Sequence, residues 1–228
     1  MTKPAPRLSV VIPVFNGEPY LAEAIRSVLD QDYDDLEVIV VDDGSTDGSS
    51  QIARQFPGIR LVRQQNGGVA VAHNAGVSRA WGELVAFLDA DDVWEPGSLA
   101  GRVGMFDDDP NVEMTHGLVV EFISPGLSSS ISIADRNLGT PIRGRLCGAT
   151  MVRRTALDRV GPMNPALRFA GWMDWLMRAD EVGLQTEFCE ELVLHRRIHG
   201  DNLTIRLPKD EYVKLLKGAL DRRRRTEE

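Results

Sequence analysis

An acidic turn with the sequence DDGSTD is the first group of residues that could do chemistry. Asp42 and Asp43 directly follow the apolar run 36–41, and Gly44 allows a tight turn after them. A carboxylate in this position can accept hydrogen bonds from the N–H of a nucleotide base or from ribose hydroxyls. A bare turn does not need two adjacent acids, so we predict that Asp43 contacts a ligand. Asp47, at the end of the turn, is instead expected to cap the next helix.

A second acidic cluster, DADD, follows another apolar run at 84–88. It places Asp89, Asp91 and Asp92 within four positions, where like charges repel unless a cation or strong donors offset them. Hard cations such as Mg²⁺ and Mn²⁺ prefer carboxylate and phosphate oxygens, and such an ion would neutralise a diphosphate leaving group. Because Asp89 and Asp91 are two positions apart, one turn can aim both at one ion. We predict a divalent-cation site here; the alternative is an acidic surface turn.

A glycine pair stands between the two acidic clusters. Gly67 and Gly68 would let the backbone approach a ligand, and the N-terminus of the helix expected after them favours anions. His73 and Asn74 belong to that helix and are expected within reach of the same rim. The pattern is neither GxGxxG nor the Walker-type GxxxxGK, which argues against an NAD-binding Rossmann domain and against a P-loop.

Strands and helices that alternate along the first half of the chain must position these residues. Strands are predicted at 8–12, 36–41, 59–62 and 83–88, and helices at 18–29, 48–56, 68–79 and 96–106. This order predicts a mostly parallel sheet flanked by helices, with ligands beyond the carboxyl ends of the strands. In the less regular second half, strands are predicted at 112–120, 146–152, 185–188 and 192–195, helices at 155–160, 172–181 and 207–225, and a long loop at 124–145. That loop is either a functional lid or disordered.

The composition is that of an ordinary globular protein with one substantial core. Of 228 residues, 43% are hydrophobic and 26% charged, and the net charge of −8 argues against a general nucleic-acid partner. Cys147 and Cys189 lack CxxC spacing, which argues against structural zinc and fits a reducing cytoplasm. No apolar run reaches the roughly 18 residues that a membrane span needs. The short apolar segment near the N-terminus is expected to be a strand, not a signal peptide.

In this order and spacing, the motifs resemble the inverting glycosyltransferase family 2, whose members have the GT-A fold. The matching stretches are IPVFN at 12–16, DDGSTD at 42–47, NGGVAVAHNAG at 66–76 and GELVAFLDADD at 82–92, with a later match at 148–169. The resemblance covers roughly residues 7–205 of the chain. It implies an α/β nucleotide-diphospho-sugar transferase with a mostly parallel central sheet.

The resemblance also implies roles for individual residues. Asp43 would hold the nucleotide base beside the turn 13–16, and Asp91 would be the closest ligand of the cation. His199, in the stretch LHRRIHGDNLT, could bind the cation or the diphosphate, helped by Arg197 and Asn202. The implied nucleotide-sugar contacts are Pro13, Phe15, Asn16, Asp42, Asp43, Gly67, Gly68, His73, Asn74, Asp89 and Arg197, and the implied ligands of Mn²⁺ or Mg²⁺ are Asp89, Asp91 and His199.

The sequence departs from the family where the catalytic base is expected. Many members carry Glu-Asp just before a helix, whereas Gly171 and Trp172 stand there in this chain. Asp174 is the only nearby carboxylate, so the base role is carried to it; the alternative is that Asp174 stabilises the helix. The implied reaction is displacement with inversion at the anomeric carbon. A non-catalytic nucleotide-sugar-binding subunit stays open, and a nucleotidyltransferase is disfavoured because residues 12–20 lack Lys and Arg.

The expected organisation is one domain at 1–205, with a nucleotide-sugar-binding half at 1–110 and an acceptor-side half at 111–205. A C-terminal helix and basic tail follow at 206–228. The donor is expected to be a UDP-sugar, with GDP- and dTDP-sugars as alternatives, and the acceptor a saccharide, a lipid-linked or another hydroxyl. The run DRRRR at 221–225 is either a solvated helix end, which the lack of a clear large apolar face favours, or a contact for anionic lipid. A cytoplasmic protein is expected, with peripheral attachment to the inner face of the membrane and homodimerisation left open.

Overall fold

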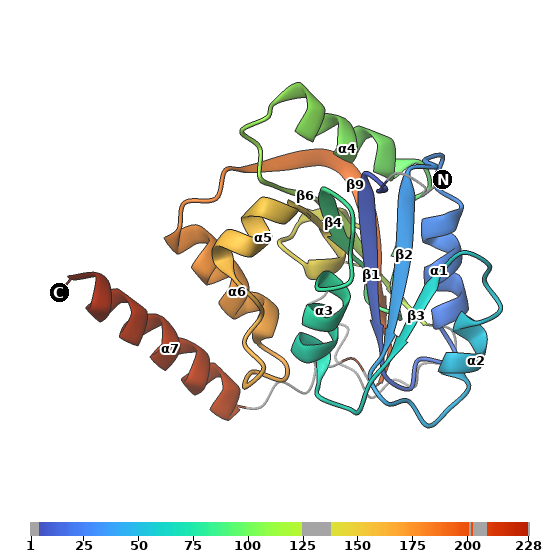
Figure 1. Cartoon of the computed structure of the whole chain (residues 1–228), viewed down its shortest axis with the longest axis horizontal. Helices are drawn as coiled ribbons and strands as arrows, with labels where there is room; N and C mark the ends of the chain where they lie inside the picture. The colour runs from blue at the N-terminus through green and yellow to red at the C-terminus, as the bar shows by residue number, and fades with distance from the viewer. Residues whose placement is uncertain (1–4, 125–137, 201, 203–208, 228) are drawn as a thin grey trace.

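A nine-stranded mixed sheet forms the centre of the molecule, in a computed structural model that describes residues 5–124, 138–200, 202 and 209–227 (Figure 1). The strands are β1 (Leu8–Val14), β2 (Leu36–Asp42), β3 (Arg60–Arg63), β4 (Leu84–Phe87), β5 (Val93–Trp94), β6 (Met114–Ile123), β7 (Ile142–Arg143), β8 (Thr150–Arg153) and β9 (Thr186–Ile198). Their order is β3-β2-β1-β4-β8-β6-β9-β5, and β7 pairs with β6 beside this path.

The half of the sheet built by β1 to β4 is parallel, as the sequence predicts. β1 pairs with both β2 and β4, and β2 pairs with β3. The continuous apolar runs arise because successive residues of a strand point to opposite faces, and both faces are covered. Val10 and Ile12 therefore join one core cluster, while Val11 joins the other.

Helices form a layer on each face of the sheet. They are α1 (Leu21–Leu29), α2 (Ser49–Ala53), α3 (Val69–Val77), α4 (Ser98–Asp108), α5 (Arg154–Val160), α6 (Gly171–Glu181) and α7 (Lys209–Glu227), with the 3₁₀ helix η1 (Cys147–Ala149). Buried side chains of α1, α2 and α4 pack into one core cluster, and those of α3, α5 and α6 pack into the other. Parallel strands and their flanking helices thus place the turns after β1, β2 and β4 at one edge of the sheet.

The second half of the sheet differs from the prediction. β8 is antiparallel to β4 and β6, whereas β9 is parallel to β6. A single strand, β9, replaces the two short strands expected at 185–188 and 192–195. Its pairing with β6 shifts register between His116 and Leu118, and this shift accommodates the residues between the two predicted strands. Gly117 is required there, since a Cβ on it would lie 2.5 Å from the side chain of Val193. β5 and β7 are two residues long, too short to show a period in the sequence.

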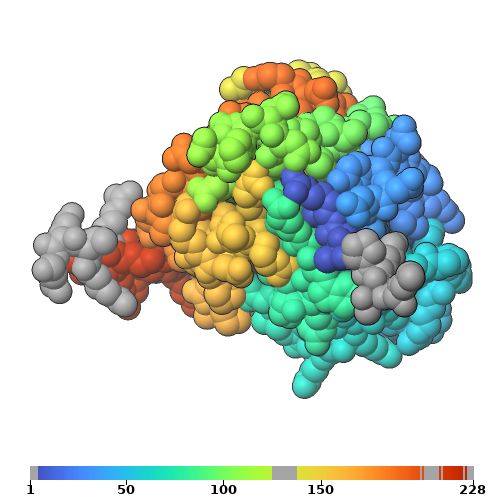
Figure 2. All heavy atoms as spheres, turned by 45° about the horizontal axis from the view of Figure 1, so that its top comes forward, coloured from blue at the N-terminus to red at the C-terminus, as the bar shows by residue number. Residues whose placement is uncertain are grey.

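The C-terminal helix α7 lies against α6 and extends from the side of the molecule (Figures 1 and 2). A small apolar cluster of Leu167, Ala170 and Leu215 lies where it docks. Within the described residues, no helix has the length and apolarity needed to cross a bilayer. Of the expected loop at 124–145, residues 125–137 lie outside the described residues and 142–143 form β7.

Candidate active site

Asp43 organises the loop that leads into α3. Its carboxylate is buried and accepts hydrogen bonds from the backbone N–H of Gly67 at 2.9 Å, the backbone N–H of Gly68 at 2.8 Å and the side-chain amide of Gln64 at 2.8 Å. A carboxylate offers about four acceptor positions, so little of its capacity is left. Asp43 and the glycine pair therefore meet at the rim, as expected, and Asp43 fixes the glycine loop in place.

Asp42 is turned into the protein and does not reach the rim. Its fully buried carboxylate accepts the backbone N–H of Ser45 at 2.7 Å and the hydroxyl of Ser50, and Arg63 lies 3.5 Å away. The nucleotide-sugar contact expected for Asp42 is thus replaced by a structural role in the turn. The cause is local, because the side chain of Asp42, the last residue of β2, points into the turn that leads to α2.

The turn after β1 is tied to the turn after β2. Asn16 adopts a positive φ of 53°, accepts the backbone N–H of Thr46 at 2.9 Å and donates its own N–H to Ser45 at 3.0 Å. Phe15, just before it, exposes its ring at this rim, whereas Pro13 is buried in β1. These contacts hold an exposed aromatic ring next to the Asp43 loop, where a planar base could stack.

Asp47 has the capping role that the sequence predicts. It accepts the backbone N–H of Ser49, the first residue of α2, at 3.0 Å, and also that of Glu18 at 3.0 Å. It thereby joins the turn after β2 to the turn after β1.

The second aspartate cluster meets the end of β9. Asp91 accepts hydrogen bonds from Nε2 of His199 at 2.8 Å and from the side-chain amide of Asn202 at 3.2 Å. Asp92 accepts the backbone N–H of Arg197 at 2.8 Å, and the Arg197 Nε donates to the carbonyl of Asp91 at 2.8 Å. Arg197, His199 and Asn202 thus converge on the DADD turn, which lies about a hundred positions earlier in the chain.

Arg197 itself is enclosed and fully engaged. Its guanidinium lies between the rings of Tyr20 and Phe122, 5.0 Å and 4.6 Å from their centroids, and it pairs with Glu23. The Tyr20 ring also lies 4.9 Å from that of His199. Arg197 therefore positions the aspartate turn and the aromatic wall around it, rather than reaching out toward a diphosphate.

The protein does not offset the negative charge that the carboxyl groups of the DADD turn would carry if all were ionised. Burial raises the pKa of Asp89 to about 7, with the charge of Asp91 adding to the rise and Arg196 opposing it. Burial and the charges of Asp91 and Asp89 raise the pKa of Asp92 well above its usual value. A bound cation would relieve this repulsion, which is the electrostatic condition for a metal site.

The family model that matches this chain is that of glycosyl transferase family 2, over residues 9–161. The chain belongs to glycosyl transferase family 2. The matched stretch includes both aspartate clusters and the glycine loop, and the family expected from these motifs is confirmed.

Relatives named as glycosyltransferases also match this chain. An uncharacterized glycosyltransferase of Nostoc sp. is 34% identical over 213 residues, covering 86% of this chain and 66% of the relative. The putative teichuronic acid biosynthesis glycosyltransferase TuaG of Bacillus subtilis is 41% identical over 104 residues, covering 43% of this chain and 41% of TuaG. The chain therefore spans less than two thirds of the length of both relatives.

Solved structures share the fold. TarS of S. aureus in complex with UDP has a TM-score of 0.72 at 20% identity, covering 93% of this chain and 64% of that chain. The mannosyltransferase PcManGT from Pyrobaculum calidifontis, in complex with GDP-Man and Mn²⁺, has a TM-score of 0.69 at 20% identity, covering 97% of this chain and 65% of that chain. These similarities confirm the expected GT-A fold class.

The DADD turn offers two carboxylates that could share a cation with phosphate oxygens. Within the described residues, no group of three or more His, Cys, Asp or Glu side chains surrounds a common point. Mg²⁺ is commonly held by one or two carboxylates together with phosphate oxygens, so a closed protein cage is not required. Asp91, with 29% of its side chain exposed, and the half-buried Asp89 satisfy that condition.

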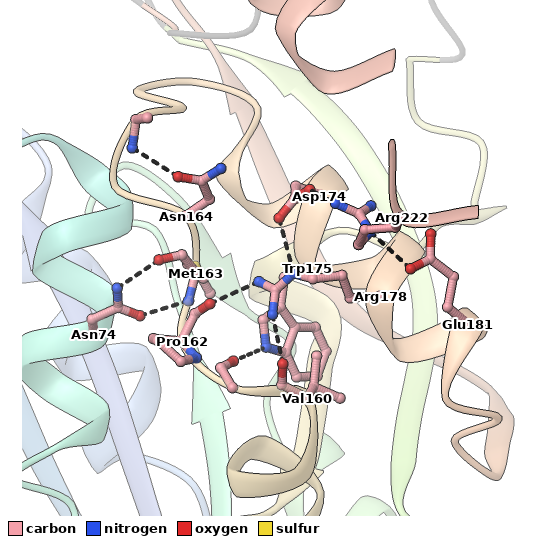
Figure 3. A network of polar contacts seen from close by, with 12 residues as sticks. Asn74, Val160, Pro162, Met163, Asn164, Asp174, Trp175, Arg178, Glu181 and Arg222 are labelled. Atoms are coloured by element: carbon pink, nitrogen blue, oxygen red, sulfur yellow. Dashed lines mark hydrogen bonds and ion pairs between the residues drawn. The ribbon is translucent and has the colours of Figure 1, made fainter. Parts of the chain in front are cut away.

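His73 and Asn74 lie away from the rim on which they were expected. The His73 ring is buried, 5.3 Å from the ring of Phe87 and 3.6 Å from the sulfur of Cys147, and burial lowers its pKa to about 4. Asn74 exchanges two hydrogen bonds with the backbone of Met163, at 2.8 and 2.9 Å (Figure 3). Both contact predictions are therefore corrected: packing of α3 on the sheet turns one side chain inward and the other toward a neighbouring loop.

Asp174 lies in a network of ion pairs that joins α6 to α7 (Figure 3). One carboxylate oxygen accepts Nε of Arg178 and the other accepts Nη1 of Arg222, each at 3.0 Å. Arg178 also donates to the carbonyls of Val160 and Pro162. Only 4% of the Asp174 side chain is exposed. These contacts favour the alternative in which Asp174 stabilises the helix, because both of its oxygens already face a guanidinium.

Packing explains why the Glu-Asp pair of family 2 is absent. A Cβ on Gly171 would lie 2.9 Å from the Cβ of Ala70 on α3, so the approach of α6 to α3 leaves no room for a side chain. Trp172 stacks on Trp175, with ring centroids 5.1 Å apart, and donates its indole N–H to the carbonyl of Arg145. The start of α6 is therefore a packed apolar contact in this chain.

Two residues near this rim were missed by the sequence analysis. The buried carboxylate of Glu211, on α7, accepts the backbone N–H groups of 168, 169 and 170 at 2.9–3.1 Å, just before α6. Arg168 donates to the side-chain oxygen of Asn66 at 3.2 Å and lies beside Gly68. It brings a positive charge to the glycine loop. No local motif marks either residue, because each acts on a segment far away in the sequence.

Proposed function

We propose that this chain transfers a sugar from a nucleoside-diphosphate sugar to an acceptor hydroxyl, with inversion and with the help of a divalent cation. The observation that carries the proposal is the meeting of Asp91 with His199 and Asn202 beyond the end of β4, with the carboxyl of Asp89 as a charge neighbour of Asp91, in a chain of family 2. Residues 1–205 would form the catalytic domain, with the donor bound by the 1–110 half.

On this proposal Asp89 and Asp91 hold Mn²⁺ or Mg²⁺, with His199 as the third candidate ligand. When bound, the ion would neutralise the departing nucleoside diphosphate. His199 and Asn202 orient the carboxylate of Asp91 through their hydrogen bonds, in the way that neighbours of metal ligands usually do. Arg197 positions the backbone of the turn.

The nucleotide would lie along the rim between the turns after β1 and β2. Phe15 offers an exposed ring to the base, and Asp43 an acceptor that keeps the Gly67–Gly68 backbone in position. Arg168 supplies positive charge beside that loop. A UDP-sugar is the first candidate, since TarS binds UDP and UDP-GlcNAc; PcManGT binds GDP-Man, which keeps a GDP-sugar as the alternative.

A second function is favoured by the surroundings of Asp174. Because this carboxylate is enclosed between Arg178 and Arg222, and Gly171 and Trp172 replace the Glu-Asp pair, the chain could bind a nucleotide-sugar without turning it over. It would then be a binding subunit whose base is supplied elsewhere.

A thermal-shift screen followed by a turnover assay tests both functions. Nucleoside diphosphates and their sugars would be added with Mn²⁺, with Mg²⁺ or with EDTA. We expect a stabilising shift that needs both nucleotide and cation, and release of the nucleoside diphosphate when a hydroxyl acceptor is present. Binding without any release would support the binding subunit. Neither binding nor release would contradict the proposal.

A further inference from the structure

The side of α7 that points away from the protein combines apolar and basic side chains. Val213, Leu216 and Leu220 are 64%, 58% and 55% exposed, and their spacing of three and four positions puts them on one side of the helix. Lys217 and Arg224 are also exposed, and each follows one of these residues by four positions. We call these five residues the outer face of α7.

The opposite side of α7 accounts for its attachment to the protein. Glu211, Leu215 and Ala219 recur every four positions and are all buried. The Glu211 carboxylate binds three backbone N–H groups before α6, and Arg222 pairs with Asp174 and Glu181. The orientation of the helix is thus fixed by its inner side, and the outer face is not used to hold it.

We propose that the outer face of α7 lies on the surface of an anionic lipid bilayer. Amphipathic helices bind membranes in this way, with aliphatic side chains in the headgroup boundary and Lys or Arg beside anionic headgroups. The chain as a whole carries a net charge of −8, whereas the outer face of α7 is positively charged. Anionic lipid attracts positive charge, so this face is suited to a bilayer although the whole chain is acidic. The sequence favoured a solvated helix end because no clear large apolar face was evident there. The apolar residues of the outer face can be recognised only once the structure shows which side of α7 packs on the protein.

Charge argues against a second copy of the chain as the occupant. A twofold contact between two outer faces would place the same patch against itself. Lys217 and Arg224 of one copy would then approach the same cations of the other, and none of the five described residues of the outer face is an acid that could offset them. A bilayer surface supplies the opposite charge.

This placement would bring the proposed donor site close to the membrane surface. Glu211, near the start of α7, binds the backbone N–H of Arg168, whose guanidinium lies beside Gly68. An acceptor hydroxyl on a membrane-bound molecule would then be within reach of the rim. This consequence, unlike the membrane contact itself, rests on the proposed function.

Vesicle co-sedimentation of the full chain tests the contact. We expect binding to phosphatidylcholine vesicles that contain phosphatidylglycerol, and much weaker binding to pure phosphatidylcholine. The double substitution Leu216→Gln with Leu220→Gln should weaken binding on the order of tenfold. Leu29→Gln is the matched control, because Leu29 is an exposed leucine on α1, on the side of the molecule opposite α7 (Figure 1). It should leave binding unchanged.

A charge variant and a mass measurement complete the test. Lys217→Glu with Arg224→Glu should remove the preference for anionic vesicles. Absence of vesicle binding by the folded chain, or equal binding of the double-leucine variant and its control, would overturn the proposal. So would a dimer, seen by sedimentation equilibrium without vesicles, that the leucine substitutions dissociate. Sugar transfer to a water-soluble acceptor is measured in parallel, so that loss of vesicle binding and loss of the proposed activity remain distinguishable.

Discussion

The acids after β4 and the acid on α6 have opposite electrostatic surroundings. Asp174 lies between the guanidinium groups of Arg178 and Arg222. Asp89 has the negative charge of Asp91 as its neighbour, and its pKa rises to about 7 because of burial and of that charge. Asp174 thus has cations as its neighbours, whereas Asp89 is held where its own charge is costly.

The difference separates an acid held in an ion-pair network from an acid at the proposed cation site. A carboxylate whose two oxygens each face a guanidinium has its charge already offset, and removing it leaves those cations without their partner. A carboxylate kept near a second one is unfavourable in the isolated protein and becomes favourable when a cation arrives. The sequence alone suggested a functional role for both Asp89 and Asp174. The charged groups around each carboxylate distinguish the two residues.

The largest expected effect is the loss of transfer on removing the charge of Asp91. Asp91→Asn keeps the size of the side chain and removes a proposed cation ligand, so kcat/KM with Mn²⁺ should fall about 10³-fold. Asp34→Asn, at an exposed position away from the cluster, serves as the control. Initial-rate measurements over a range of Mn²⁺ concentrations check this. Activity near that of the parent would place the cation away from the DADD turn.

Removing Asp174 should instead lower stability. Asp174→Ala leaves two guanidinium groups without their shared partner, and we expect the free energy of unfolding to fall by about 2–4 kcal/mol. Asp180→Ala, which breaks an ion pair with Arg145 at the surface, should cost less than about 1 kcal/mol. Denaturant unfolding measures both. A folded Asp174 variant that binds the donor but has lost turnover would contradict the structural role and return the base role to Asp174.

A pH series tests the raised pKa of Asp89. In unfolded protein the Asp89 carboxyl ionises near its usual pKa of 3.8, whereas in the folded protein it keeps its proton up to about pH 7. Between these pH values the folded state holds a proton that the unfolded state has released. The free energy of unfolding therefore falls as the pH rises from about 4, and the loss is complete once the pH has passed about 7.

Asp89→Asn should therefore stabilise the cation-free protein at pH 8, by about 1–3 kcal/mol, and change it little at pH 4. Thermal unfolding in EDTA at both pH values measures the difference. Equal effects at the two pH values would count against a raised pKa at Asp89. Asp174→Asn provides the contrast, since it is expected to destabilise the protein at neutral pH.

Much of the first half of the fold could be predicted from the sequence. β1, β2 and β4 are apolar runs that end in turns, and parallel pairing puts those turns on one edge whatever the details of packing. The convergence of His199 with Asp91 was also expected, because both belong to motifs of one family. These predictions depend on local pattern and on topology.

Helical phase and distant partners could not be predicted. α3 has small apolar residues on several sides, so the sequence does not say which side meets the sheet, and His73 is buried for that reason. Asp174 owes its role to Arg222, 48 positions later. The start of α6 depends likewise on Glu211, 41–43 positions after the backbone groups it binds. Such pairs carry no local signal.

The smallest expected effect concerns Arg168, which lies between α7 and the glycine loop. Its backbone N–H is held by Glu211 of α7, and its exposed guanidinium lies beside Gly68 at the proposed donor site. Because an exposed charge is screened by water, Arg168→Gln should weaken binding of a nucleoside diphosphate only about 3- to 5-fold. The backbone contact with Glu211 is kept, so stability should not change. Calorimetric titration with UDP and Mn²⁺ at low and high salt checks this. The difference in affinity between the variant and the parent should shrink as the salt concentration rises. A difference in affinity that does not depend on salt would show that Arg168 acts through packing rather than charge.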